Sequence, residues 1–437
     1  MAASSFDSSS GSSSDSSSVF HDCPSFIPSI SGRAKITSAK RIPETIIADT
    51  YSINHRGHSY GQDYVISIPL PKSSGYIQIL ADGNGENGEV VSMICAESLL
   101  TNLLEKYEKL LALCISGDMP NIECIMNQAF KDADESLLIL APLIATNSGS
   151  TCTVLLVLIH KKRRYILTSY IGDSPAMIVC SDGHYQYLTK YVHNPENIHE
   201  WRRHIKNMQQ KGLEPEQYAL HRANCSKGPS VPYPSTDLRT PIPLYIPDDN
   251  GDYKVNMKGV EALHSVGMPI GGAQSLRRYI EKDPVTDQWV SLPGHEHENM
   301  ASTVNGGTQL TRCFGTFFQK PQVDSTPTSI LSEVLPQHEY YAVILSDGAG
   351  DTMFMDPKVS DFPSWVQRKS VLPFVITDMM KDDVKPALLS EYLITHSLKL
   401  GDEDNHPSYT ISSNSDGLLS PSWDDCSAVS VYLPKIV

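Results

Sequence analysis

The sequence contains no uninterrupted apolar run close to the ~20 residues that a membrane-spanning helix needs, so no membrane partner is expected. Its N-terminus has neither the basic stretch nor the apolar core of a secretory signal, and we expect none. Positive charge is also scarce, because 35 Lys and Arg face 50 Asp and Glu, for a formal net charge of −15. This balance argues against a nucleic acid or an anionic membrane as the main partner.

Paired cysteines are missing as well. The chain has nine cysteines, an odd number, and no two of them form a Cys-x-x-Cys pair. The pattern excludes a regular disulfide framework or a zinc ribbon and favours free thiols. We therefore expect the protein in a reducing compartment, the cytoplasm, with the nucleus as an alternative.

The N-terminal tail has almost no apolar side chains. Residues 4–18 are nearly all Ser, Gly and Asp, and such a segment buries too little apolar area to offset its ordering entropy. We predict a disordered tail and linker over residues 1–41 and one folded domain over residues 42–437. Within that domain, residues 189–309 are rich in Pro, Asn and charge, which indicates a long insertion or flap.

Hydrophobic patterning in the rest of the chain has both the strand and the helix period. Runs rich in β-branched and aromatic residues predict strands at 64–68, 76–81, 151–159, 164–171, 176–180, 185–188, 340–345 and 428–433. Short turns between the four central strands predict an antiparallel meander. Helical spacing predicts helices at 92–114 and 121–138, and further helices between 365 and 400. Helices and strands in separate runs indicate an α+β fold.

Four aspartates stand beside predicted strands, next to turn residues: Asp82, Asp173, Asp347 and Asp424. Asp82 alone is also compatible with a plain β-turn, because Asp-Gly is a common hairpin pair. Its loop is not an EF-hand, since Asn87 and Met93 stand where Gly and Glu are needed. Four such carboxylates at sheet ends predict a shared pocket for a hard cation, Mg²⁺ or Mn²⁺.

Short motifs follow one another along the chain: Gln62-Asp63-Tyr64, Asp82-Gly83-Asn84-Gly85, Ser148-Gly149-Ser150-Thr151, Ile171-Gly172-Asp173-Ser174, Leu188-Thr189-Lys190 with His193, Leu310-Thr311-Arg312-Cys313-Phe314-Gly315, Ser346-Asp347-Gly348-Ala349-Gly350-Asp351 and Asp424-Asp425-Cys426-Ser427. Their order resembles that of the metal-dependent Ser/Thr protein phosphatases of type 2C. The resemblance covers residues 51–437. It implies a four-layer α/β/β/α sandwich of two antiparallel sheets flanked by helices, with two metal ions at one edge.

The resemblance also implies roles for individual residues. The metal ligands would be Asp82, the Gly83 carbonyl, Asp347 and Asp424, with Asp173 and Asp351 at a weaker third ion. Asp63 would order the metal-bound waters. The implied reaction is hydrolysis of phosphoserine or phosphothreonine in a phosphoprotein. Two bound ions would neutralise the phosphate oxygens and lower the pKa of the attacking water. Nothing in the sequence indicates the oligomeric state.

Two departures from the family pattern bear on catalysis. Asn84 stands where His is usual, and Asn cannot protonate the leaving group, a contribution of ~10²–10⁴-fold. The phosphate-binding Arg falls on His58, with Arg56 as the nearby substitute. The alternative hypothesis is a pseudophosphatase that binds a phosphoprotein or a regulatory partner without turnover. A metal nuclease fits the carboxylates, but the chain lacks the basic groove that a polyanion requires.

Overall fold

The computed structural model describes residues 46–54, 61–73, 75–213, 218–222, 243–265, 270–275, 280–282, 289–291, 310–354, 371–382, 384–404, 410–413, 419–422 and 425–436. All of them belong to one compact unit, Gly32–Val437. The predicted tail over residues 1–41 lies outside the described residues. Arg56, His58 and Asp424 lie outside them as well.

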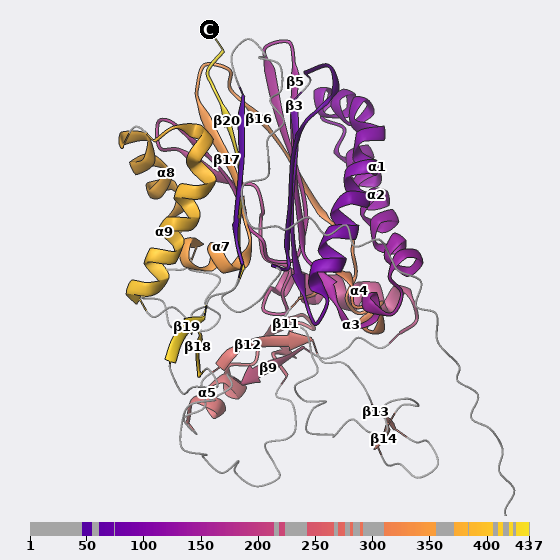
Figure 1. Cartoon of the computed structure of the whole chain (residues 1–437). Helices are drawn as coiled ribbons and strands as arrows, with labels where there is room; N and C mark the ends of the chain where they lie inside the picture. Colours follow the sequence, from indigo (N-terminus) through magenta and orange to yellow (C-terminus); the bar gives the residue numbers. More distant parts are fainter. Residues whose placement is uncertain are drawn as a thin grey trace, which may run out of the picture. The chain divides into compact units, whose positions relative to one another are not determined.

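Two antiparallel sheets form the centre of this unit (Figure 1). The larger sheet runs β15 (Phe314–Gly315), β4 (Gly149–Ser150), β3 (Gly75–Asn84), β5 (Cys152–His160), β6 (Arg163–Ile171) and β16 (Thr328–Val334), and β2 (Asp63–Pro69) also pairs with β3. The smaller sheet runs β1 (Ile47–Ile53), β20 (Cys426–Leu433), β17 (Tyr340–Leu345), β7 (Ala176–Cys180) and β8 (Tyr185–Tyr187).

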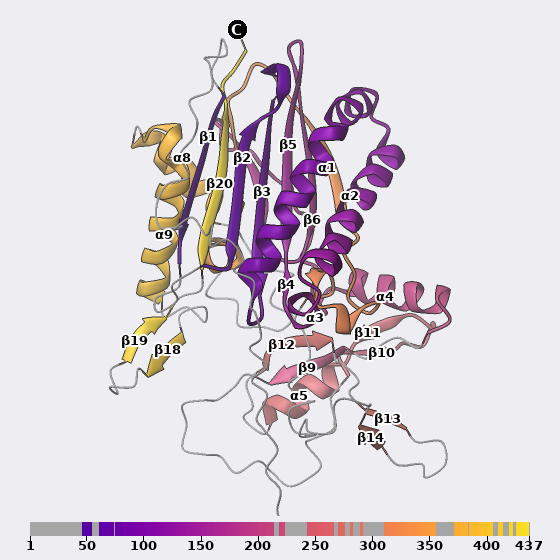
Figure 2. The same ribbon diagram turned by 45° about the vertical axis from the view of Figure 1, so that its right-hand side comes forward.

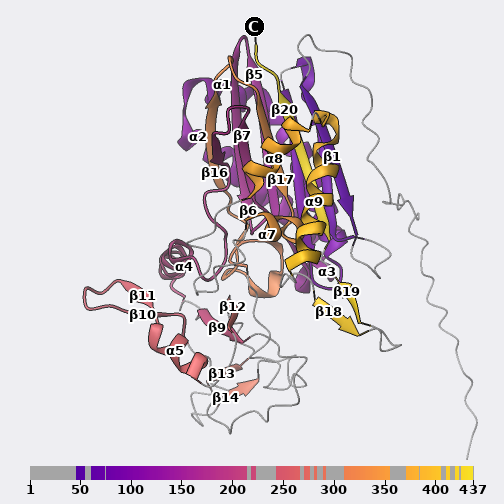
Figure 3. The same cartoon turned by 90° about the vertical axis from the view of Figure 1, so that its left-hand side faces the viewer.

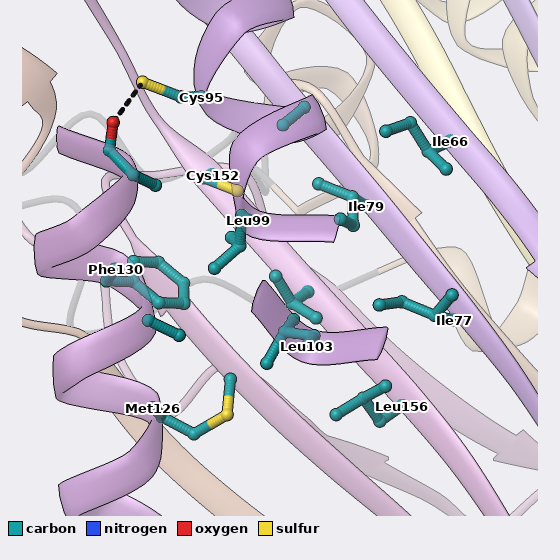
Figure 4. Close-up of a cluster of buried hydrophobic side chains, with 14 of the residues drawn as sticks. Ile66, Ile77, Ile79, Cys95, Leu99, Leu103, Met126, Phe130, Cys152 and Leu156 are labelled. Carbon is teal, nitrogen blue, oxygen red and sulfur yellow. Dashed lines mark hydrogen bonds between the residues drawn. The ribbon is translucent and has the colours of Figure 1, made fainter. Parts of the chain in front are cut away.

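Helices α1 (Gly88–Ser116) and α2 (Met119–Leu140) cover one face of the larger sheet (Figure 2). Leu99 and Leu103 of α1 and Phe130 of α2 pack on Ile79 and Leu156 of the sheet, all completely buried (Figure 4). This is the largest apolar cluster among the described residues, so the helix pair and the sheet stabilise each other mainly by burial.

The opposite faces of the two sheets pack on each other. Leu155 of β5 faces this inner layer with Ile344 of β17 and Val429 of β20, whereas its neighbour Leu156 faces the helices. This alternation is the period-2 pattern of a strand buried on both faces. Helices α7 (Asp347–Phe354), α8 (Leu372–Lys381) and α9 (Leu389–Asp404) cover the far face of the smaller sheet (Figure 3). The predicted α+β fold of two antiparallel sheets flanked by helices is confirmed.

The predicted meander is wrong at its centre. β5 and β6 pair, and β7 and β8 pair, but the chain passes from one sheet to the other between Ile171 and Ala176. Gly172 makes this crossing possible, because its φ is +92° and a Cβ there would lie 2.5 Å from Thr151 Cβ. Strand periodicity identifies each strand but not the sheet that it joins.

Strand β3 is longer than predicted, because it continues through Asp82 and Gly83 to Asn84. The short strand β4 pairs with these last residues. Strands β1 and β16 were not predicted. Their burial patterns are mostly intermediate, so their sequences lack the apolar runs that mark central strands.

Residues 189–309 contain structure that the sequence analysis missed. Helix α4 (Ile198–Gln210) starts at Asn197, whose side chain accepts a hydrogen bond from the His199 N–H. The other elements here are β9 (Tyr218–Arg222), β10 (Tyr245–Pro247), β11 (Tyr253–Val255), α5 (Met257–Ser265), β12 (Ile270–Ser275), β13 (Ile280–Lys282) and β14 (Trp289–Ser291). Trp201 of α4 stacks on Tyr245 in a small separate apolar cluster. That this region is an insertion stays a prediction.

The remaining elements are short: α3 (Ile144–Asn147), β18 (Thr410–Ser413), β19 (Leu419–Ser422) and single turns at Pro71–Ser73, Phe317–Gln319 and Pro386–Leu388. Among the helices that the structure describes, none combines the length and the apolar character that crossing a membrane requires.

Candidate active site

Asp63 and Asp82 lie directly opposite each other on β2 and β3. The Gly83 N–H next to Asp82 donates to the Gln62 carbonyl at 3.1 Å, so the pairing holds through the strand ends. Directly opposed residues of an antiparallel pair project to the same face. Two predicted site carboxylates therefore share one face of the larger sheet.

Asp173 is held beside the same strand end. The Thr151 N–H donates to the Asp82 carbonyl at 2.8 Å. The hydroxyl of Thr151 lies 2.8 Å from that of Ser174, which follows Asp173. The crossing between the sheets therefore passes beside Asp82.

The same crossing touches the smaller sheet where Asp347 begins α7. The Leu345 N–H donates to the Pro175 carbonyl at 3.0 Å. Ser346, next to Asp347, donates its N–H to the Ser427 carbonyl at 2.9 Å, and its Oγ accepts from the Ser427 N–H at 2.8 Å. The end of β17 and the start of β20 are thereby joined.

A buried carboxylate joins the two sheets. Asp425 Oδ2 accepts from the Gln62 N–H at 2.6 Å, and the Asp425 carbonyl accepts from Ser346 Oγ at 3.3 Å. Gln62 is 363 positions away in the chain and directly precedes Asp63. Together with the peptide bonds between chain neighbours, these hydrogen bonds form a closed ring that we call the strand-end ring. Its hydrogen-bonded links are Gln62–Gly83, Asp82–Thr151–Ser174, Pro175–Leu345, Ser346–Ser427, Ser346–Asp425 and Asp425–Gln62.

The strand-end ring carries or directly adjoins four of the predicted site carboxylates: Asp63, Asp82, Asp173 and Asp347. Their side chains are partly buried. Asp351 lies in α7, but its side chain is outside the described residues, and Asp424, Arg56 and His58 are not described at all. Sequence reasoning gave Asp425 no role, although its place in an Asp-Asp pair before a strand was a visible signal.

The tightest group of potential metal ligands lies elsewhere in the described residues. Within the described residues, only Cys180, Asp182 and His338 form a set of three or more His, Cys, Asp or Glu side chains with ligand atoms within 4.8 Å of one another. The described aspartates of the strand-end ring therefore do not by themselves form such a three-oxygen cluster. Asp424, the predicted ligand adjacent to Asp425, lies outside the described residues.

Asn84 ends β3 opposite Gly149 of β4. Its Oδ1 would lie 3.0 Å from a Cβ at Gly149, so the glycine makes room for the amide. Its Nδ2 is buried and makes no hydrogen bond to any described residue. A buried donor without a partner costs about 1–3 kcal/mol, which is typical of a site that takes a ligand or water.

Gly83 leaves no room for a side chain. A Cβ there would lie 2.3 Å from the Gly88 carbonyl oxygen and 2.8 Å from that of Gln62. We expect Gly83→Ala to lower the free energy of unfolding by about 3 kcal/mol, because backbone atoms must move to relieve the contact. Gly117→Ala is the control. A Cβ at Gly117 meets nothing within 4 Å, so only the backbone φ of +71° opposes a side chain there. Urea unfolding that shows equal losses would contradict the steric explanation.

A buried ion cluster is centred on Glu200 of α4. The carboxylate of Glu200 accepts two hydrogen bonds from Arg312, at Oε1 from Nη2 (2.5 Å) and at Oε2 from Nε (3.0 Å). It also pairs with Arg203. Burial raises the pKa of Glu200, but the charges of Arg203 and Arg312 outweigh this and hold the pKa well below its usual range. Arg203 in turn pairs with Asp324.

His193 supports the sheet crossing. Its ring stacks on Tyr170 at 4.6 Å, and its Nδ1 accepts from the Gly172 N–H at 3.2 Å. Burial holds the pKa of His193 well below its usual value, so the ring is neutral. Since Nδ1 accepts, Nε2 carries the proton and donates to Thr328 Oγ1 at 2.9 Å. Through its hydrogen bond to Gly172, His193 orients the turn that carries Asp173.

Sequence comparisons identify no relatives: no family model matches the chain, and no curated protein matches it. Solved structures do resemble it. A serine-threonine phosphatase 2C from Toxoplasma gondii is 15% identical, covers 90% of this chain and 96% of its own, and has a TM-score of 0.50. A C. elegans sex-determining protein is 15% identical with a TM-score of 0.48; the match covers 89% of this chain and only 65% of the C. elegans chain. The Toxoplasma match shows a shared fold, and the resemblance predicted from the motifs is confirmed at that level.

Proposed function

We propose that this chain, which shares the fold of a serine-threonine phosphatase 2C, hydrolyses phosphoserine or phosphothreonine in a phosphoprotein with Mg²⁺ or Mn²⁺. The observation that carries the proposal is the strand-end ring. It links the backbone segments around Asp82, Asp173 and Asp347, which lie far apart in the sequence, at one edge of the two sheets. A set of unrelated turns has no reason to converge in this way.

The donor set suits hard cations. The proposed ligands of two principal ions are Asp82, the Gly83 carbonyl, Asp347 and Asp424, with Asp173 and Asp351 at a further, weaker ion. All of these donors are oxygens, which Mg²⁺ and Mn²⁺ prefer, and neither a thiol nor an imidazole is among them. Carboxylates that share one site repel one another, so a site of this composition depends on cations for its charge balance.

Other residues act on the substrate and the attacking water. When bound, the ions would neutralise phosphoryl oxygens and lower the pKa of that water. Asp63, opposite Asp82, would accept a hydrogen bond from the water and fix its direction. Arg56 or His58 would hold the substrate phosphate, because a cation or a ring N–H can donate to its oxygens.

Phosphate release from a phosphoserine peptide by the purified full chain tests the proposal. Release should require Mn²⁺ or Mg²⁺, stop with a chelator and resume when the metal returns. If the chain binds Mn²⁺ and the phosphopeptide but releases no phosphate, it is the pseudophosphatase of the alternative hypothesis. If it binds neither, both proposals fail.

Asn84 should limit the rate on poor leaving groups. We expect Asn84→His to raise kcat for a phosphoserine peptide by about 10²-fold, because the serine alkoxide needs a proton as it leaves. The rate for p-nitrophenyl phosphate should hardly change, since nitrophenolate leaves without protonation. Asn84→Gln is the matched control. An equal gain on both substrates would show that the histidine acts in some other way.

A further inference from the structure

Three side chains of different chemistry meet at one end of the smaller sheet. Cys180 is the last residue of β7, Asp182 lies in the turn before β8, and His338 lies two residues before β17. Their ligand atoms all lie within 4.8 Å of one another, and His338 Nδ1 is 3.9 Å from Asp182 Oδ2.

Backbone hydrogen bonds fix this arrangement. Cys180 is paired with Tyr340 in the β7–β17 ladder. The Ser181 N–H donates to the Glu339 carbonyl at 3.0 Å, which ties the turn after β7 to the segment before β17. The Asp182 carboxylate accepts from the His184 N–H at 3.0 Å and is thereby oriented within the turn. The fold therefore brings the three residues together at this end of the sheet.

The cluster is separate from the candidate active site. Strand β7 begins at Ala176, which pairs with Ile344 beside the strand-end ring, and ends at Cys180, which pairs with Tyr340. Four residues of strand correspond to roughly 13 Å. A ligand at Cys180 would therefore occupy the far end of the same two strands.

We propose that Cys180, Asp182 and His338 bind one divalent transition-metal ion of the zinc class. Thiolate, imidazole and carboxylate together suit Zn²⁺ and Co²⁺, whereas Mg²⁺ and Mn²⁺ favour sites made of oxygen donors. Three protein ligands leave one tetrahedral position for water. Cys180 is 5% exposed, while the side chains of His338 and Asp182 are 36% and 42% exposed, so the ion enters from solvent past these two.

The competing reading is a buried thiol that packs as a small hydrophobe and donates a weak hydrogen bond to Asp182. The two readings differ in the fate of the thiol proton when metal is added. Metal binding would displace that proton and join the β7–β8 turn to the segment before β17. A packing thiol would keep its proton in the presence of metal.

Titration of the full chain with Co²⁺ separates the readings, because a thiolate–cobalt bond gives a charge-transfer absorption that oxygen ligands do not. We expect one saturable equivalent with this band. Cys180→Ser should abolish the band, and His338→Gln and Asp182→Asn should each weaken Co²⁺ binding by about 10- to 100-fold or more. Zn²⁺ should displace the cobalt, and Mg²⁺ should not.

Two variants serve as controls. Cys124→Ser removes an exposed cysteine on α2, and Asp82→Asn alters the candidate active site; both should keep the band. His338→Gln changes a partly exposed side chain, so it tests the site even if Cys180→Ser fails to fold. The proposal is overturned if the wild-type chain shows no band, if the band survives Cys180→Ser or is unaffected by His338→Gln, or if Cys124→Ser removes it. None of these results depends on phosphatase activity.

Discussion

Asp82→Asn is expected to lower kcat/KM for metal-dependent phosphopeptide hydrolysis by about 10³-fold. Asp82 stands opposite Asp63, and its carbonyl accepts the hydrogen bond from Thr151 that begins the link to the smaller sheet. Asparagine keeps the shape of the side chain but removes the negative charge that a divalent cation requires. Steady-state kinetics with saturating Mn²⁺ measure the effect.

Asp378→Asn is the matched control, because Asp378 is an exposed acid on α8 whose partner is Lys381 within the same helix. Its kinetics should equal those of the wild type. Urea unfolding of Asp82→Asn should show a folded protein, since the substitution relieves repulsion between carboxylates. Unchanged turnover in Asp82→Asn would place the chemistry elsewhere in the chain.

Glu200→Gln is expected to lower the free energy of unfolding by about 3–5 kcal/mol. Its side chain has no exposure, and that of its partner Arg312 only 5%. A neutral amide leaves the buried guanidinium without its counter-charge, which costs far more than the loss of a surface pair. Denaturant unfolding followed by far-ultraviolet circular dichroism measures the loss.

The exposed pair of Arg163 and Glu333 supplies the matched control. It has the same two-hydrogen-bond geometry, with both distances 2.7 Å, but about half of each side chain is exposed. Glu333→Gln should therefore cost much less than Glu200→Gln, since solvent screens the pair. Equal losses would show that burial does not set the strength of the Glu200 cluster.

The difference in unfolding free energy between the wild type and Glu200→Gln should depend on pH. Because the folded-state pKa of Glu200 lies below its unfolded value of about 4.3, its charge stabilises the fold fully above that pH. The stability is lost as the pH falls from about 4.3 through the lower folded-state pKa. The difference between wild type and Glu200→Gln should thus be constant near neutrality and shrink in acid. A difference that grew in acid would contradict a lowered pKa for Glu200 in the folded state.

Much of the fold could be predicted because local patterns determine it. The apolar spacing of Leu99 and Leu103 is helical, and both side chains do lie in the core under the larger sheet. Helix α4 was missed because its apolar residues, among them Trp201 and Ile205, are few among charged neighbours. The spacing of Trp201, Ile205 and Met208 is nevertheless helical, so this periodicity was a signal that could have identified the helix.

The candidate site could be predicted only in part. Asp82 and Asp347 were identified because each follows an apolar run and precedes glycine. Which strand ends meet is a long-range property, and the contact between Gln62 and Asp425 has no local signal. The same holds for Cys180 and His338, which come together only because β7 and β17 are neighbours.

Mn²⁺ binding to the wild type, Asp82→Asn, Asp347→Asn and the double variant is the most direct test of the central claim that the strand-end carboxylates share hard cations. Free Mn²⁺, followed by electron paramagnetic resonance, should show at least two ions bound per wild-type chain. Each single variant should lose an ion. The double variant should lose little more, because the effects of substituting two residues that bind the same ion are not additive. Wild-type protein that binds no Mn²⁺, or single variants that bind it as the wild type does, would contradict the account.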